Sequence, residues 1–439
     1  MKNTTLGNNT KFDYDVAVIG LGRVGLPLSL SMASKGIKVI GVDINQSLID
    51  DVNHKIFPFR EEGYDELIKQ VEFVATTEYD VLKQSQNIII TVGTPLMNHI
   101  ETDLSHILDV LNKLLPYLQP NHHLILRSTI APGTTTFVKD FIEQNSELKL
   151  GDNFFMTFCP ERMAEGKSMV EIETLPQIIG SQDEKSAQLA QDFFERFVLE
   201  VLHTDFISAE LVKLFNNISR YVYFSTANQF AIIADQYGAN IHNVIEMSNY
   251  KYPRGVIPKP GFTAGTCLRK DFGMINESIP FTDLLLSAWK VNEFMPKFLV
   301  DGAKKRTSLK AKKIGVLGYT FKEDVDDIRD SLVPKLVRYL VRENPKQILI
   351  HDPNLTNIID GIYQNYSLSD TLNNIDILIL AIPHREFKEN INTILNSLKD
   401  DVLIIDLWNV TKVGGVFINK SDLEGMRASN NFSLAVQSK

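Results

Sequence analysis

Cysteine is scarce in this sequence, with Cys159 and Cys267 alone among 439 residues. Two cysteines exclude a disulfide framework but leave room for one reactive thiol. Long apolar runs are also missing, since none approaches the roughly 20 residues that a membrane-spanning helix needs. The first ten residues are polar and lack an apolar signal core. We therefore expect a soluble, cytoplasmic protein that does not bind membranes.

A surplus of positive charge is missing as well. The chain has 45 Lys and Arg against 54 Asp and Glu, a formal net charge of −9. This balance argues against a general nucleic-acid binder, although it allows a local basic pocket for a phosphorylated small molecule. Disorder is excluded because 44% of the residues are hydrophobic, enough to bury a core. The length predicts two to four domains of roughly 100–200 residues each.

What the chain does contain is an alternation of strand-like runs with helix-compatible segments. This pattern is typical of a parallel sheet with crossover helices. The expected strands are Val16–Gly20, Val39–Asp43, Asn87–Val92, His123–Thr129, Phe154–Cys159, Gln177–Gly180, Lys313–Gly318, Gln347–His351, Asp376–Ile382 and Val402–Leu407.

The middle of the chain differs from both ends. Helical spacing predicts helices over about Ser208–Tyr237 and Thr282–Lys305, with a Pro- and Gly-rich loop, Tyr252–Gly265, between them. We therefore predict an α/β fold with two Rossmann-like, doubly wound domains joined by a helical core. The expected domain boundaries are 1–205, 206–305 and 306–439. Clefts between such domains commonly hold ligands.

A glycine motif follows the first expected strand and precedes a helical run. Gly20 permits the tight turn, Gly22 lets a pyrophosphate approach the backbone, and Gly25 lets helix and strand pack closely. Asp43 ends the next strand, at the position of the ribose-binding acid. Its carboxylate can accept hydrogen bonds from the ribose hydroxyls and would repel a 2′-phosphate, so the sequence favours NAD over NADP. Gly93 and Thr94 close a later strand at the same edge. The alternative is a glycine turn without a nucleotide.

A second dense motif, Pro260–Asp271, surrounds Cys267. Small residues let the backbone wrap closely around a ligand, and Arg269 and Lys270 favour a thiolate. Asp271, four residues after Cys267, is a candidate to act on water. The alternative is a buried hydrophobic cysteine, which fits Cys159 inside an apolar strand better.

Other candidate groups are polar residues whose spacing or place allows a function. Glu161 and Glu165 follow a strand, and Lys213 and Asn217 share one face of a helix. For both pairs the alternative is ordinary solvent-exposed polarity. The segment Ser128–Thr134 ends a strand at the cofactor edge or caps a helix. The charged segment Phe321–Arg329 is a candidate to bring Lys322 and Arg329 into a cleft. The alternative is a solvated charged loop.

Taken together, these motifs resemble the nucleotide-sugar 6-dehydrogenases of the UDP-glucose/GDP-mannose dehydrogenase family. The resemblance covers about Tyr14 to Asn409. The motifs stand in family order: GLGRVGLP, VDIN, VGTP, STIAPGT, CPERMAEG, AELVKLFNN, GFTAGTCLRKD and GYTFKEDVDDIRDS.

The resemblance implies an NAD-binding domain, a helical dimerisation core and a UDP-sugar-binding domain in a homodimer, without a metal. It also implies a four-electron oxidation of the sugar C6 alcohol to a carboxylate by two NAD, in polysaccharide or capsule precursor synthesis. Cys267 then corresponds to the nucleophile that passes through a thiohemiacetal and a thioester. Lys213 corresponds to a lysine that stabilises oxyanions, and Asn217 to its partner.

The same resemblance assigns the remaining site residues. Glu161 and Glu165 correspond to an acidic pair near water and substrate, Thr129 to a residue that holds water, and Asp271 to an acid that assists the base chemistry. The implied cofactor contacts are Gly20, Gly22, Arg23, Val24, Gly25, Asp43, Gly93, Thr94, Thr129, Glu165 and Arg329. The implied substrate contacts are Glu161, Met163, Glu165, Lys213, Asn217, Arg254, Gly261 and Lys322, with Arg254 reaching the substrate of the neighbouring subunit.

The chain departs from the family pattern at three places. Glu61–Tyr64 replaces Glu-Pro-Gly-Leu, Gly265-Thr266 replaces Gly-Gly, and Asp406–Trp408 replaces Asp-Gly-Arg. The segment Tyr252–Val256 is similar to the His-Pro-Arg-Val of N-acetylhexosamine members, so we favour a UDP-N-acetylhexosamine over UDP-glucose. Two other hypotheses stay open at this point: a two-electron β-hydroxyacid-type dehydrogenase, and a nucleotide-sensing protein without catalysis.

Overall fold

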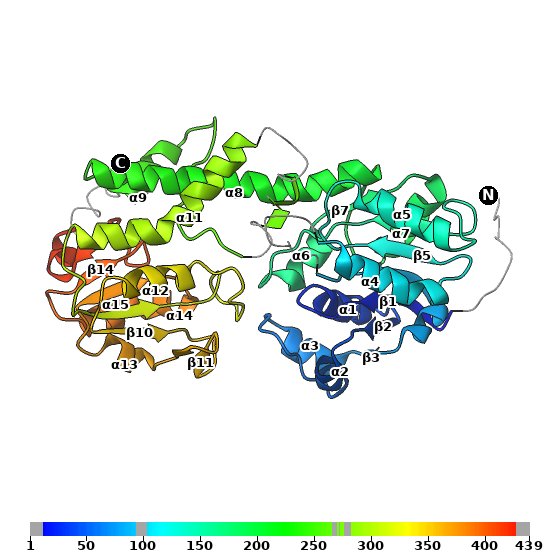
Figure 1. The fold of residues 1–439 in the computed structure, drawn as a ribbon, viewed down its shortest axis with the longest axis horizontal. Coiled ribbons are helices and arrows are strands. Elements are labelled where there is room, and N and C mark those ends of the chain that lie inside the picture. Colours follow the sequence, from blue (N-terminus) through cyan, green and yellow to red (C-terminus); the bar gives the residue numbers. More distant parts are fainter. Residues whose placement is uncertain (1–11, 94–102, 266–269, 272, 276–281, 427–439) are drawn as a thin grey trace. The chain divides into compact units, whose positions relative to one another are not determined.

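The computed structural model describes residues 12–93, 103–265, 270–271, 273–275 and 282–426. The chain divides into two compact units. Unit 1 comprises Met1–Asn216 with Gly273–Ile279, and unit 2 comprises Asn217–Phe272 with Pro280–Lys439. Helix α8 (Phe206–Gln236), 31 residues long, begins in unit 1 and continues in unit 2 (Figure 1). The α/β architecture with two sheets joined by a long helix was predicted from the sequence.

Unit 1 is built on an eight-stranded sheet with the order β3-β2-β1-β4-β5-β6-β7-β8. Its strands are β1 (Tyr14–Ile19), β2 (Val39–Val42), β3 (Val74–Thr76), β4 (Ser85–Ile90), β5 (His123–Leu126), β6 (Phe155–Phe158), β7 (Gln177–Gly180) and β8 (Val201–Thr204). The first six strands are parallel. Because parallel strands end at one edge, the turns after β1, β2, β4 and β5 gather there.

The expectation of a wholly parallel sheet was wrong for the last two strands. Strand β7 pairs antiparallel with β6 through Phe158 and Gly180, and β8 pairs parallel with β7. The connection holds only the short helix α6 (Ser168–Thr174) and does not form a long crossover. Strand β7 therefore starts beyond the end of β6 and runs back toward it. Strands β3 and β8 were not predicted, because their short sequences carry no clear alternation.

Helices cover both faces of this sheet. Alternate side chains of β1 divide between two cores, Val16 and Val18 in one and Ala17 and Ile19 in the other. The first core includes α1 (Gly25–Ser34), α2 (Gln46–Asn53), α3 (Tyr64–Gln70) and α7 (Glu184–Phe194). The second includes α4 (Ser105–Leu114), α5 (Thr134–Asn145) and the start of α8. This is the doubly wound arrangement.

Unit 2 is built on a five-stranded sheet with the order β10-β9-β13-β14-β15. The strands are β9 (Lys313–Leu317), β10 (Gln347–His351), β13 (Ile377–Leu380), β14 (Leu403–Ile405) and β15 (Phe417–Asn419), and the last runs antiparallel. A separate hairpin pairs β11 (Ile358–Ile359) with β12 (Tyr363–Gln364). The first strand, β9, lies between the second and third, so β9 and β13 flank the point where the strand order reverses.

Helices also cover both faces of the second sheet. One core joins the sheet to α9 (Ile241–Asn249), α11 (Asp283–Lys304), α12 (Val333–Val341) and the end of α8. The other core includes α13 (Leu368–Leu372), α14 (Arg385–Glu389) and α15 (Ile391–Asn396). Within the described parts of the chain, no helix is long and apolar enough to cross a membrane.

Candidate active-site residues

The glycine turn after β1 has the geometry that a dinucleotide requires. Gly20 has a φ of +94°, which favours glycine, and it turns the chain out of the strand. A Cβ on Gly25 would lie 1.8 Å from the carbonyl oxygen of Gly20, so only glycine lets α1 approach the turn. Around Gly22, in contrast, a Cβ would meet no atom within 4 Å. The space beside Gly22 and the start of α1, after Val24, fits a pyrophosphate.

Asp43 fastens the same turn to the end of β2. Its Oδ2 accepts the backbone N–H of Leu21 at 2.7 Å, and its Oδ1 accepts that of Asn45 at 2.9 Å. Each carboxylate oxygen has a second lone pair, and Asp43 is only half-buried, so ribose hydroxyls can still donate to it. A Cβ on Gly93 would meet no atom within 4 Å, and Thr94 lies outside the described residues. The residues present therefore fit NAD.

The glycine turn is also linked to the segment 161–168. Arg23 forms an ion pair with Glu165 at 2.7 Å, and its guanidinium lies 5.0 Å from the ring centre of Phe59. The pair is largely shielded, with side-chain exposures of 21% and 18%. The structure thus brings together two predicted cofactor-binding residues from distant parts of the sequence.

Glu161 is a buried carboxylate of unit 1 that several N–H groups bind. Arg127 donates to its Oε2 from Nε at 2.9 Å and also from Nη2, and the backbone N–H groups of Arg162 and Met163 donate to its Oε1. Burial alone would raise the pKa of Glu161, but the charges of Arg127 and Lys213 and the Met163 N–H lower it overall. Glu161 is therefore an ionised anchor beside Lys213, with its oxygens engaged by N–H donors.

Further carboxylates fix the backbone of the segment 161–168. Glu61 accepts the backbone N–H of Gly166 at 2.7 Å and both the N–H and the hydroxyl of Ser168. Glu171 accepts the N–H of Ala164 at 2.7 Å. The segment that carries Glu161, Met163 and Glu165 is therefore held at several points, as a preorganised site requires.

Helix α8 presents Lys213 and Asn217 one turn apart. Both side chains are buried, with exposures of 8% and 7%. Glu210, one turn earlier, is also buried and accepts the backbone N–H groups of Gly133 and Thr135 at 2.7 and 2.8 Å. It thereby ties α8 to the start of α5 and fixes where Lys213 lies. Thr129 is half-buried in the turn between β5 and α5.

In unit 2, Asn217 meets another predicted residue. Its Nδ2 donates to Oδ2 of Asp271 at 2.6 Å, and Asp271 is completely buried. Cys267 lies outside the described residues. The loop before it is held by Asn228 of α8, whose Oδ1 accepts the N–H of Gly261 at 2.9 Å and whose Nδ2 donates to Asn292 of α11.

The loop 261–265 touches two other segments of unit 2. A Cβ on Gly261 would lie 2.2 Å from the ring of Trp408, and one on Gly265 would lie 2.7 Å from Phe321. Trp408, which stands where the family has arginine, donates from its indole N–H to the Ala381 carbonyl at 2.8 Å. Gly261 therefore lies against Trp408, which departs from the family pattern, and Gly265 lies against Phe321, the residue before Lys322.

The other predicted side chains make local contacts. Exposed Arg254 donates from Nε to the Tyr252 hydroxyl at 2.9 Å and lies over its ring. Lys322 is half-buried, with its ammonium 5.7 Å from the ring centre of Phe321. Arg329, 61% exposed, forms a bidentate ion pair with buried Asp327. Their predicted contacts with ligands stay predictions.

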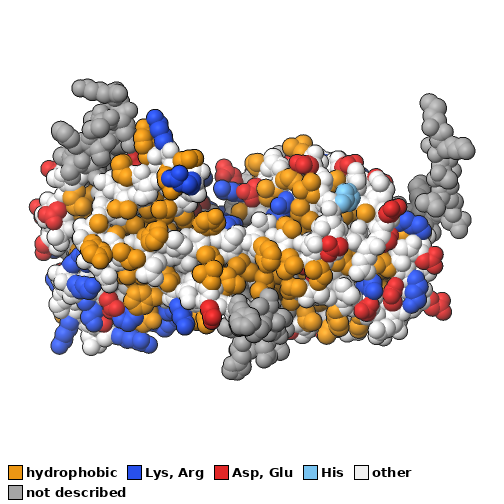
Figure 2. Space-filling model, turned by 90° about the horizontal axis from the view of Figure 1, so that it is seen from above, with side chains coloured by type: hydrophobic (Ala, Val, Ile, Leu, Met, Phe, Trp, Pro, Cys, Tyr) orange, Lys and Arg blue, Asp and Glu red, His pale blue; other side chains and the backbone are white. Residues whose placement is uncertain are grey.

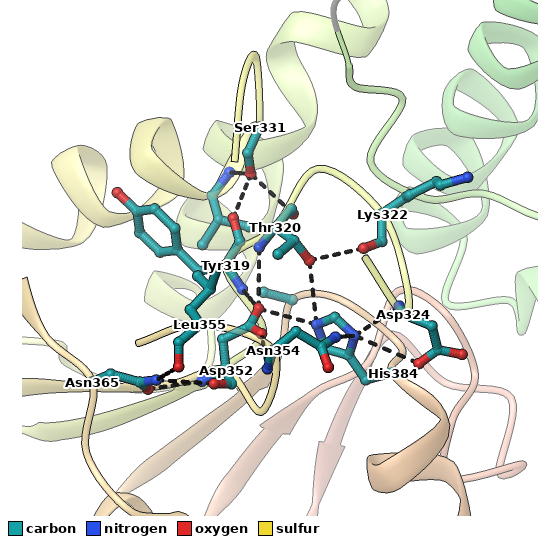
Figure 3. A network of polar contacts seen from close by, with 12 residues as sticks. Tyr319, Thr320, Lys322, Asp324, Ser331, Asp352, Asn354, Leu355, Asn365 and His384 are labelled. Atoms are coloured by element: carbon teal, nitrogen blue, oxygen red, sulfur yellow. Dashed lines mark hydrogen bonds and ion pairs between the residues drawn. The ribbon is translucent and has the colours of Figure 1, made fainter. Parts of the chain in front are cut away.

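Sequence reasoning missed several residues that fix this geometry: Arg127, Glu210, Asn228, Asp352 and His384. Arg127 lies beside one identified motif, Glu210 lies inside another, and Asn228 lies further along α8, but the partners of all three are distant in sequence. Asp352 and His384 form a buried network with Thr320, Asp324 and Asn354 at the end of the second sheet (Figure 3). A charged residue directly after an apolar strand is the signal that could have identified Asp352, by analogy with Asp43. Among the described residues, no three His, Cys, Asp or Glu side chains gather as a metal site.

Comparison with known families matches three segments to one family. Residues 14–198 match the NAD binding domain of the UDP-glucose/GDP-mannose dehydrogenase family, residues 207–293 its central domain, and residues 315–413 its UDP binding domain. The matches follow one another along the chain and cover most of it.

Individual relatives agree with this assignment. The chain is 33% identical to a UDP-N-acetyl-D-mannosamine dehydrogenase of Pyrococcus horikoshii over 92% of this chain and 98% of the relative. It is 32% identical to one of Methanocaldococcus jannaschii over 90% and 92%. Among solved structures, the P. horikoshii enzyme superposes with a TM-score of 0.80 at 32% identity, covering 88% and 93% of the two chains. The UDP-N-acetyl-mannosamine dehydrogenase Cap5O of Staphylococcus aureus superposes with 0.79 at 31% identity, covering 90% and 94%.

Proposed function

Because the chain belongs to the UDP-glucose/GDP-mannose dehydrogenase family, we propose that it oxidises a UDP-N-acetylhexosamine, with UDP-N-acetyl-D-mannosamine as the first candidate. The family is one of NAD-dependent nucleotide-sugar dehydrogenases. The observation that carries the choice of sugar is that relatives over nine-tenths of the chain bear the N-acetylmannosamine name. The product is the uronate, the C6 carboxylate of the UDP-sugar.

The reaction divides into two oxidations and a hydrolysis. NAD supplies the hydride acceptor for both oxidations. In the first, the C6 carbon loses a hydride and its hydroxyl loses a proton, which gives an aldehyde. The Cys267 thiolate adds to this aldehyde, and the thiohemiacetal loses a second hydride and a proton to become a thioester. Water cleaves the thioester and restores the thiol, so one alcohol and one water yield a carboxylate.

Charge and hydrogen bonding assign roles to the residues around this chemistry. We assign buried Lys213 the role of stabilising the oxyanions that form at C6, because a preorganised positive charge is most effective there. Asn217 and Asp271, bonded at 2.6 Å, act with it. We assign Glu161 the role of holding a permanent negative charge beside Lys213, since its ionised carboxylate is engaged by Arg127. Thr129 and Glu165 complete the predicted water and cofactor contacts.

A panel of UDP-sugars with NAD, followed by NADH absorbance, tests this proposal. We expect turnover with UDP-N-acetyl-D-mannosamine above UDP-glucose, and about two NADH per sugar consumed. One NADH per sugar, together with an active Cys267→Ser variant, would instead favour the two-electron β-hydroxyacid type. NAD and UDP-sugar binding without any NADH would favour a sensor. A preference for UDP-glucose would overturn the choice of sugar and leave the reaction type intact.

We also propose a homodimer that forms through helices of unit 2. Tyr223 and Phe230 stand seven residues apart on α8, so they lie on one face of the helix, and both are exposed together with Ile233 and with Tyr237 directly after the helix. Tyr237 is 84% exposed. Figure 2 looks onto the side where α8 runs in Figure 1 and shows hydrophobic side chains gathered there. Such a face in a soluble chain fits burial against a second copy.

Sedimentation of the wild type and of Phe230→Asp tests the dimer. We expect the wild type to be dimeric at micromolar concentration and the variant to be monomeric, because a carboxylate in an apolar interface stays desolvated without a partner. Phe137→Asp, an exposed aromatic residue on α5 of unit 1, is the matched control and should leave the dimer unchanged. A monomeric wild type would contradict the proposal. The use of NAD and a UDP-sugar fits a cytoplasmic location, which we retain as part of the proposal.

A further inference from the structure

His384 lies at the end of the third strand of the second sheet and is completely buried. Its Nδ1 lies 2.9 Å from the backbone nitrogen of Asp324 and 3.0 Å from Nδ2 of Asn354. Its Nε2 lies 3.0 Å from Oδ2 of Asp352 and 3.3 Å from the hydroxyl of Thr320. Figure 3 shows the imidazole between the Asp352 carboxylate and the backbone of Asp324.

These contacts define the tautomer of His384. A backbone N–H can only donate, so Nδ1 of the imidazole must accept from Asp324 and carries no proton. The proton therefore resides on Nε2, which donates to the Asp352 carboxylate. His384 thus acts as a bridge that accepts at one end and donates at the other. No other neutral arrangement satisfies both contacts.

The bridge fastens both ends of a short turn, Thr320–Asp324. At its start, the backbone N–H groups of Tyr319 and Thr320 donate to Oδ2 of Asp352 at 2.7 and 3.1 Å. At its end, Asp324 donates to His384 and adopts a left-handed φ of +59°, which is costly for a residue with a side chain. The hydrogen bond to His384 helps to hold this conformation.

Lys322 lies in the middle of this turn. Its carbonyl accepts the Thr320 hydroxyl at 2.8 Å, and its side chain extends away from His384 (Figure 3). The backbone of Lys322 is therefore fixed from both sides, and its side chain lies on the outer side of the turn, away from the imidazole. Ordering such a turn before binding spares the entropy that a mobile loop would lose on contact with the ligand.

We propose that His384, in its neutral Nε2–H form, is a positioning residue that presents Lys322 to the diphosphate of the UDP-sugar. The inference rests on the proposed function and on the substrate contact that the family resemblance implies for Lys322. His384 touches no substrate itself and acts through the turn. Loss of the bridge raises the KM for the UDP-sugar, whereas the KM for NAD, whose predicted site is built by the glycine turn of unit 1, stays unchanged.

Two variants separate the two halves of the bridge. His384→Asn retains an acceptor near the position of Nδ1 and loses the reach to Asp352. His384→Gln retains a donor near the position of Nε2 and loses the acceptor for Asp324. Tyr319 and Thr320 bind Asp352 without His384, so the Asp324 end depends more on the imidazole. We expect His384→Gln to raise the KM for the UDP-sugar about tenfold and His384→Asn to raise it less than about threefold.

His351→Asn is the matched control. His351 lies on β10 of the same unit, packs against Phe387 as His384 does, and donates to the Tyr366 carbonyl. Its side chain contacts Tyr366 and Phe387, outside the turn Thr320–Asp324, so its replacement should leave the KM for the UDP-sugar unchanged. Equal rises in both KM values, or equal effects of His351→Asn and His384→Gln, would reduce His384 to a structural residue and overturn the proposal.

A measurement that does not need turnover tests the bridge separately. Nitrogen-15 spectra of the histidine-labelled full chain, with the His384 signals assigned by His384→Asn, report which ring nitrogen carries the proton. We expect the Nε2–H tautomer, and an Nδ1–H signal would overturn the inference. Calorimetry with UDP should show weaker binding by His384→Gln than by the wild type. A wild type that binds neither UDP nor the UDP-sugar overturns the proposed function and this inference together, even if the tautomer is as expected.

Discussion

The two sheets carry the same arrangement of residues where their first two strands end. Gly20 follows β1 with a φ of +94°, and Gly318 follows β9 with a φ of +91°. Asp43 follows β2 and accepts the N–H of Leu21, the second residue after β1. Asp352 follows β10 and accepts the N–H of Tyr319, the second residue after β9. Even the turn after each acid is alike, because Asn45 and Asn354 donate to the other carboxylate oxygen, each at 2.9 Å.

The two acids differ in what surrounds them. Asp43 is half-buried and stands beside the open space at Gly22, whereas Asp352 is 1% exposed and its remaining capacity is taken by Thr320 and His384. The same backbone framework thus leaves Asp43 accessible to a ribose, whereas the oxygens of Asp352 are bound by the protein itself. An acid at the end of the second strand therefore indicates a fastened turn, and it indicates a nucleotide site only where the adjoining loop leaves space.

The largest expected effect concerns Glu161. Like Asp352, it is a buried carboxylate whose oxygens are bound by donors of the protein itself. Arg127→Met removes its guanidinium partner and leaves a buried charge. We expect the free energy of unfolding to fall by about 3–5 kcal/mol. Urea denaturation measures this loss. Arg127→Lys retains the charge and should recover part of the stability; a loss below about 1 kcal/mol for the methionine variant would show that Glu161 is not held as described.

Asp352→Asn and Asp43→Asn test the difference between a buried and an accessible acid directly. An amide at position 352 places a donor where N–H groups converge, so we expect a loss of about 3 kcal/mol in the free energy of unfolding. At position 43 we expect a loss below about 1 kcal/mol and a roughly tenfold higher KM for NAD. Denaturation measures the free energy of unfolding of both variants, and steady-state kinetics on the same preparations measure the KM for NAD. Equal losses of stability in the two variants would contradict the distinction between a buried and an accessible acid.

The buried acid should also appear in the pH dependence of stability. Burial alone would raise the pKa of Asp352, but the His384 bond and the N–H groups of Asn354 and Tyr319 lower it overall. A carboxyl with a lowered pKa stabilises the folded chain above its ordinary range and loses this contribution as pH falls. We expect the free energy of unfolding to decline below about pH 4, and less steeply in Asp352→Asn. Parallel curves for the two proteins would contradict the assignment.

The glycines of the open turn should separate binding from stability. Gly22→Ala adds a Cβ to empty space, so we expect an unchanged melting temperature and weaker NAD binding. Gly25→Ala drives a Cβ against the Gly20 carbonyl and should cost about 1–3 kcal/mol of stability besides NAD binding. Thermal melts and NAD titrations distinguish the two. Undiminished NAD binding by Gly22→Ala would remove the pyrophosphate from this turn.

Arg329→Ala should have only a small effect on stability. Its ion pair with Asp327 is 61% exposed on the arginine side, so we expect a change below about 1 kcal/mol. If Arg329 contacts the cofactor as the family resemblance implies, the KM for NAD rises while stability is nearly constant. Arg385→Ala, another exposed arginine of unit 2, is the control and should leave this KM unchanged. Equal NAD kinetics for the wild type and Arg329→Ala would remove this contact from the proposal.

The sequence predicted those features that depend on neighbours along the chain. The glycine turn at Gly20, the acid after β2, the apolar strands and helix α8 all follow from local pattern and spacing. The reversal of β7 could not be predicted, because it depends on where the segment 161–168 is fixed by Glu61 and Arg127. His384 was equally invisible, since a histidine after an apolar strand has no distinctive spacing from Asp324 or Asp352. The roles of such residues depend on partners that are distant in sequence, so they become evident only in the folded structure.

The burial of Cys159 has a practical consequence for enzymology. Its thiol has no exposed surface, and burial raises its pKa to about 12, so it is inert toward alkylating reagents in the native protein. Since the chain has two cysteines, any label taken up under native conditions must report on Cys267. If Cys267 is the nucleophile as proposed, a thiol reagent counts competent active centres in a preparation, and protection by a bound UDP-sugar can be followed without measuring turnover.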